Sequence, residues 1–139
     1  MDRISPWLKR WSLSDLDISE PWLQSMSLRS FDSDDHLVRC GEHSDTLYLL
    51  DSGLVRLYYV TPDGKERNKA FYRAGQITGA VSAAMTGTTA PFSIQCLEPV
   101  AAVCCSFSAL SGATNHHPGL ARLNRELLSE AFIRNEQRE

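Results

Sequence analysis

Four cysteines are the residues in this chain with the greatest capacity for metal or redox chemistry: Cys40, Cys96, Cys104 and Cys105. None belongs to a Cys-x-x-Cys pair, and the last two are adjacent. Neighbouring residues on a strand point to opposite faces of a sheet, so Cys104 and Cys105 cannot act together as ligands of one ion. We therefore interpret the cysteines as small buried hydrophobes in a reducing compartment, without a metal or redox role.

Histidine is the other residue type that could carry chemistry, and it occurs as His36, His43, His116 and His117. A haem-based gas sensor would need an axial His or Cys, but we interpret these histidines as solvated loop or capping residues. An enzyme built on a cupin jelly roll would need His-x-His for its metal, and the sequence has none. It also lacks a Gly-x-Ser-x-Gly element and a phosphate-binding loop. We predict no catalytic residue, no metal and no cofactor.

Charge and hydropathy argue against a DNA-binding protein and against a membrane or secreted protein. The formal net charge is −3 and no cluster of Lys and Arg forms a stripe, so we do not expect this chain to bind DNA by itself. No segment approaches the roughly 20 strongly apolar residues of a membrane span. The N-terminus lacks the apolar core and cleavage site of a signal peptide. These features predict a cytoplasmic protein without a membrane partner.

The elements that would position these residues are mostly short strands. Before residue 28, Trp7, Leu8 and Trp11 lie at helical spacing. Thereafter, short runs rich in aromatic and branched residues are separated by Gly, Pro and Asp, which predicts an antiparallel sandwich or jelly roll. These runs are 36–38, 47–50, 54–60, 69–72, 92–96 and 100–104. Residues 61–64 (Thr-Pro-Asp-Gly) predict a tight hairpin, and residues 80–85 a short helix.

The C-terminal segment predicts a long amphipathic helix that begins at Pro118. Its apolar residues recur at three- and four-residue steps: Leu120, Leu123, Leu127, Ala131 and Phe132. Such a stripe needs a partner, either the sandwich or a second copy of the helix. No helix stop signal follows, so we expect a chain that is cut short.

Four segments carry a resemblance to a known family. They are GEHSDTLYLLDSG at 41–53, PDGKE at 62–66, GQITG at 75–79, and Leu97-Glu98. Together they resemble the cyclic-nucleotide-binding domain of the Crp/Fnr transcription regulators, over about residues 31–139. The resemblance implies a mainly β fold with flanking helices, namely a double-stranded β-helix (jelly roll) followed by a long dimerisation helix. It also implies a homodimer, and DNA binding only through a C-terminal helix-turn-helix domain that is missing here.

The resemblance weakens at the ligand pocket. In family members that bind nucleotides, a Glu after the glycine that matches Gly79 accepts from the ribose, and an Arg followed by Ser or Thr binds the cyclic phosphate. This sequence has Ala80, Ala90 and Pro91 at those positions. Loss of two charge-assisted hydrogen bonds costs about 3–6 kcal/mol. We therefore disfavour usual binding of cyclic AMP or cyclic GMP.

The remaining concave site is predicted to be filled by its own side chains or to take a less charged effector. Its expected residues are Tyr72, Gly79, Ala80, Val81, Ser82, Ala84, Ala90, Pro91 and Phe92.

The resulting hypothesis divides the chain into N-terminal helices (1–27), a β-roll effector domain (28–117) and the start of a dimerisation helix (118–139). The function implied is effector sensing and dimerisation in a Crp/Fnr-like regulator. Genuine cyclic-nucleotide binding and a ligand-free interaction module stay open as alternatives. An iron–sulfur sensor of the family would need cysteines near the N-terminus, whereas the first one here is Cys40.

Overall fold

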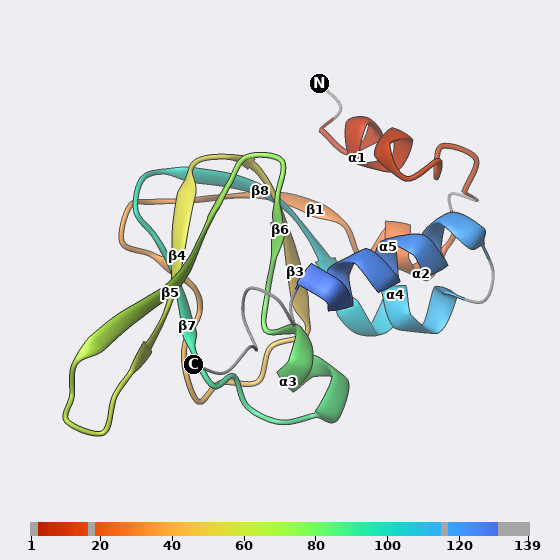
Figure 1. Ribbon diagram of the computed structural model, residues 1–139. Coiled ribbons are helices and arrows are strands. Elements are labelled where there is room, and N and C mark those ends of the chain that lie inside the picture. Colours follow the sequence, from red (N-terminus) through yellow and green to blue (C-terminus); the bar gives the residue numbers. More distant parts are fainter. Residues whose placement is uncertain (1–2, 17–18, 115–116, 131–139) are drawn as a thin grey trace.

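Two four-stranded antiparallel sheets face each other and most of the helices gather on one side of them (Figure 1). This computed structural model describes residues 3–16, 19–114 and 117–130. The first sheet has the strand order β1-β8-β3-β6: Ser27–Phe31, Val100–Ser106, Thr46–Ser52 and Ile77–Thr78. The second has the order β2-β7-β4-β5: His36–Val38, Ser93–Cys96, Leu54–Val60 and Glu66–Arg73. The predicted jelly-roll class is confirmed.

The central strand β3 is buried on both faces, because two different cores pack against it. Tyr48 and Leu50 point between the sheets, whereas Leu47 and Leu49 point outward into a cluster formed with the helices. The same alternation on β8 places Cys104 in the inner core and Cys105 in the outer one. The prediction that these neighbours face opposite ways is confirmed, and the cause is the two-residue period of a strand.

Five helices complete the described chain: α1 (Ser5–Arg10), α2 (Pro21–Gln24), α3 (Val81–Thr86), α4 (Phe107–Ala113) and α5 (Pro118–Glu130). All but α3 lie together beside the first sheet (Figure 1). Within the described ranges, no helix is long and apolar enough to cross a membrane.

Local sequence signals account for the ends of several elements. Ser106 caps α4, because its hydroxyl accepts a hydrogen bond from the Ala109 amide at 3.0 Å. Asp45 supports the same helix end by accepting from the Ser108 amide at 3.1 Å. In the β4–β5 hairpin, Gly64 has φ of +85°, a left-handed conformation that glycine adopts without strain. The predicted hairpin at 61–64 is confirmed.

Two strands were not predicted from the sequence. The side chains of β1 are exposed or only partly buried, and its sequence Ser-Leu-Arg-Ser-Phe shows no clear alternation. Strand β6 has two residues. Both owe their conformation to pairing with a longer neighbour, β1 with β8 and β6 with β3.

Candidate functional site

Four of the residues that the sequence predicted for the concave site contribute to the inner core of the roll. Tyr72, Ala80, Ala90 and Phe92 lie in one inner core cluster, as expected for residues that share a site. Tyr72 is fully buried and Phe92 is 4% exposed. Tyr72 and Phe92 are therefore part of the packed inner core. The two alternatives that the sequence left open, a site filled by its own side chains and a site for a less charged effector, stay predictions.

The three positions that replace the family's ligand contacts have ordinary structural surroundings. Ala80 is the N-cap residue of α3 and has no side-chain hydrogen bond. The Ala90 amide donates to the Glu42 carbonyl at 2.8 Å, and the Ala90 carbonyl accepts from the Gly41 amide at 2.8 Å. Pro91 is exposed. These three side chains offer neither a carboxylate nor a guanidinium to a ligand.

The other residues predicted for the pocket divide between different surroundings. Val81 is buried in the outer cluster with the helices, and Ala84 packs against that cluster. Their expected place in a ligand site stays a prediction. Ser82 is partly exposed. Gly79 is buried with φ of +157°, and a Cβ there would lie 2.8 Å from the Thr46 carbonyl oxygen. Gly79 thus permits the close turn into α3.

The apolar stripe of α5 is covered by its own chain. Leu120, Leu123 and Leu127 are at most 4% exposed and belong to the outer cluster, together with Trp7 and Trp11. The sequence left open whether the stripe packs against its own chain or against a second copy of the helix. In the structure, it packs against its own chain. The predicted dimer residues Ala131 and Phe132 lie outside the described residues. A dimer contact through this helix stays a prediction.

A glycine lets α5 approach the N-terminal segment closely. A Cβ on Gly119 would lie 2.6 Å from both the Trp11 carbonyl oxygen and Leu13 Cδ2. His117 precedes it, and His117 Nδ1 accepts from the Gly119 amide at 3.0 Å. The ring proton therefore belongs on Nε2, which faces the Asp15 carboxylate at 3.0 Å. That hydrogen bond lowers the pKa of Asp15 below its ordinary value.

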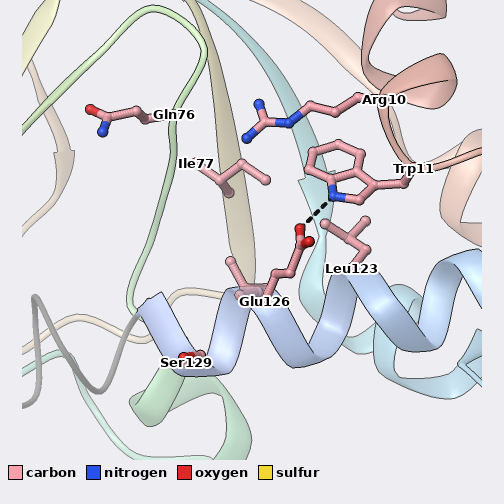
Figure 2. A pocket seen from close by; sticks show the side chains of 8 residues that line it. Arg10, Trp11, Gln76, Ile77, Leu123, Glu126 and Ser129 are labelled. Carbon is pink, nitrogen blue, oxygen red and sulfur yellow. Dashed lines mark hydrogen bonds between the residues drawn. The ribbon is translucent and has the colours of Figure 1, made fainter.

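A second concavity, which the sequence analysis missed, lies between α1, the β5–β6 turn and α5. It is open to solvent, has a volume of about 460 Å³ and is lined by Arg10, Trp11, Gln76, Ile77, Leu123, Glu126, Leu127 and Ser129. Figure 2 shows Arg10 and Trp11, Ile77 of β6, and Leu123 and Glu126 of α5 around this space. We call this space the α1–α5 cleft. Its residues are separated by up to 119 positions, so no local motif could have indicated it.

Arg10 and Glu126, which carry opposite charges, both lie beside Trp11 in the α1–α5 cleft (Figure 2). The Arg10 guanidinium lies 4.7 Å from the centre of the Trp11 ring and donates to the Gly75 carbonyl at 2.6 Å. On α5, a Glu126 carboxylate oxygen accepts from Trp11 Nε1 at 2.7 Å. The ion pairs found among the described residues do not include Arg10 or Glu126.

Cysteine and histidine form no ligand cluster in the part of the chain that the structure describes. Burial raises the pKa of the Cys96 thiol to about 11 and that of Cys105 to about 12. His36 Nε2 lies 2.7 Å from the Tyr58 hydroxyl. Burial is also the main cause that lowers the pKa of His36, and the positive charges of Arg39 and Arg56 add to it.

The two facing sheets, with α3 after β6 and the other helices beside the first sheet, form a double-stranded β-roll. The chain belongs to the cyclic nucleotide-binding domain family, whose model it matches over residues 28–116. Comparison with curated protein sequences finds no match.

Solved structures of transcription regulators share this fold. The sensor domain of the transcriptional regulator DNR from Pseudomonas aeruginosa has a TM-score of 0.73 and 21% identity, over 98% of this chain and 93% of that one. The Catabolite Activator Protein of Thermus thermophilus has a TM-score of 0.69 and 21% identity, over 88% of this chain and 58% of that one. FixK2 from Bradyrhizobium japonicum has a TM-score of 0.67 and 19% identity, over 78% of this chain and 52% of that one. The chain therefore aligns with little more than half of the last two proteins.

Proposed function

We propose that this chain is the effector-sensing and dimerisation domain of a Crp/Fnr-type transcription regulator. Its family membership and its similarity to the DNR sensor domain over nearly the whole chain support this role. The domain would act in the cytoplasm, without catalysis, and would reach DNA only through a further domain. We also propose that it does not bind cyclic AMP or cyclic GMP through the family's usual contacts.

The observation that carries the second proposal is the packed interior of the roll. Tyr72 is fully buried there, and Ala80 and Ala90 are each 2% exposed. A cyclic nucleotide would have to displace packed side chains, yet it would gain neither of two charge-assisted hydrogen bonds, worth about 1.5–3 kcal/mol each. That deficit corresponds to about two to four decades in affinity.

Calorimetric titration of the purified protein with cyclic AMP and cyclic GMP tests this proposal. We expect no saturable heat up to roughly 1 mM nucleotide, where a −4.1 kcal/mol interaction would be half saturated. Circular dichroism before and after the titration establishes that the protein stays folded. Saturable binding of either nucleotide would overturn the negative proposal and favour a genuine cyclic-nucleotide-binding domain.

Dimerisation through the α5 stripe requires a second arrangement of this helix. Because Leu120, Leu123 and Leu127 are buried within one chain, they could pair with another copy only after leaving their present contacts. A helix with two alternative partners is a two-state element, and an effector that binds one state better shifts the balance between them. Effector sensing would then consist of holding α5 on its own chain or releasing it.

Sedimentation velocity over a range of protein concentrations tests this part of the proposal. A Gly119→Ala variant, in which the added Cβ displaces α5 from Trp11 and Leu13, should show a larger dimer fraction than the parent protein. Gly112→Ala is the matched control, because a Cβ at Gly112 meets nothing within 4 Å. An unchanged dimer fraction in Gly119→Ala would contradict the release of α5. A dimer that responds to no ligand would favour the ligand-free interaction module.

A further inference from the structure

We propose that the α1–α5 cleft is the effector site of this domain and that it binds a small zwitterion with an apolar body, as in an aliphatic amino acid. The inference rests on the proposed sensing function. It adds a binding site and a class of ligand, since the interior of the roll is packed with side chains. A volume of about 460 Å³ lies within the range of small-molecule sites, roughly 300–1,000 Å³.

The arrangement of charge in the cleft favours a zwitterion. Arg10 and Glu126 line the same space with opposite charges, and Trp11 binds both, Arg10 through its ring face and Glu126 through its Nε1. A lone anion would meet the Glu126 carboxylate, and a lone cation would meet the Arg10 guanidinium. A ligand with a carboxylate at one end and an ammonium nearby satisfies both groups.

Both charged groups are held in position and retain bonding capacity. The Arg10 guanidinium is held by the Gly75 carbonyl and by the faces of Trp7 and Trp11, whose ring centres are 5.4 and 4.7 Å away. A guanidinium has five N–H donors, so further donors remain for a carboxylate. The bond from Trp11 uses one oxygen of Glu126 and leaves the other for an ammonium. Such preorganisation reduces the entropic cost of binding.

The rest of the cleft supplies an apolar wall for the body of the ligand. Leu123 and Leu127 are 2% and 4% exposed, so packing fixes their positions. Ile77 of β6 lines the same space and lies across from Leu123 in Figure 2. A branched aliphatic side chain is the group that this wall would remove from water. The polar groups would thus fix the orientation, and the wall would select for size.

The position of the cleft connects ligand binding to α5. Its residues come from α1, the β5–β6 turn and α5, so one ligand would contact all three. A ligand that binds only when these elements are together stabilises that state. We therefore expect it to hold α5 on its own chain and to lower the dimer fraction.

Calorimetry with the whole 139-residue protein tests the site, with L-leucine, L-isoleucine and L-valine as probes. Two analogues separate the charges: 4-methylpentanoate lacks the ammonium of leucine, and 3-methylbutylamine lacks the carboxylate. We expect saturable binding of at least one amino acid, and binding of each analogue weaker by about 10- to 100-fold, because each lacks one charge-assisted contact.

Variants then locate the site. Arg10→Gln and Glu126→Gln should each weaken amino-acid binding by about 10- to 100-fold. Lys9→Gln is the matched control, because Lys9 lies next to Arg10 on α1, is exposed, and is not among the residues that line the cleft. An amino acid that binds Arg10→Gln and the parent protein equally well would refute the location.

The two proposals fail in different ways. If none of the three amino acids binds and cyclic nucleotides do not bind either, the cleft proposal is overturned and the proposed sensing function is not. If a cyclic nucleotide binds saturably, the proposal that this domain does not bind cyclic AMP or cyclic GMP in the usual way is wrong. This conclusion does not depend on the result with the amino acids.

Discussion

Substitution of Gly119 by alanine should destabilise this protein, although the same change usually stabilises a helix. Alanine is favoured over glycine inside a helix by about 1 kcal/mol. At Gly119, however, the new Cβ would lie 2.6 Å from the Trp11 carbonyl oxygen, a backbone atom that cannot rotate away. Overpacking of this kind costs about 1–3 kcal/mol. The net effect is a destabilisation of up to about 2 kcal/mol.

Gly112→Ala provides the reference, since Gly112 is helical and its added Cβ would meet nothing within 4 Å. This variant should gain about 1 kcal/mol, and the difference between the two variants isolates the cost of the contact. Urea unfolding followed by tryptophan fluorescence is a suitable assay, because Trp7, Trp11 and Trp22 all lie in the outer cluster. If Gly119→Ala is stabilised as much as Gly112→Ala, α5 does not pack against residues 11–13 and the argument fails.

Three further predictions concern packing, thiols and pH. Leu123→Ala should lower the free energy of unfolding by about 2–5 kcal/mol in urea titrations. Arg122 is the exposed neighbour, and Arg122→Ala should change this free energy by no more than about 0.5 kcal/mol. Equal effects of the two substitutions would contradict the burial of the apolar stripe of α5. A thiol reagent should label Cys40 quickly in the native protein and should reach the other cysteines only on unfolding, because Cys96, Cys104 and Cys105 are buried. Folding lowers the pKa of His36 below its ordinary value of 6.5, so the folded state disfavours the charged ring. The stability contributed by the neutral ring is complete above pH 6.5. It is lost as the pH falls from 6.5 through the lower folded pKa, because the unfolded chain then binds the proton more readily. In urea titrations, the free energy of unfolding of His36→Gln should therefore fall less than that of the parent protein as the pH is lowered from about 7 through the folded pKa of His36. An equal decrease in the two proteins would refute this prediction.

The sequence by itself determined what depends on near neighbours in the chain. The turn at Gly64 and the cap at Ser106 follow from backbone geometry and from hydrogen bonds within a few residues. The opposite directions of Cys104 and Cys105 follow from the period of a strand. The residue types at positions 80 and 90 already show that a carboxylate and a guanidinium are missing there. The prediction against the usual binding of cyclic nucleotides therefore did not depend on the tertiary structure.

Tertiary structure decided which surface covers each apolar face. The periodicity of Leu120, Leu123 and Leu127 shows that the helix has an apolar stripe, but burial is non-directional, and the same stripe suits its own chain or a second copy. Likewise, the sequence could not decide that Val81 packs in the outer cluster with the helices. The α1–α5 cleft lay beyond sequence reasoning, because Trp11 and Glu126 are 115 residues apart. Only the folded chain brings those side chains into one site.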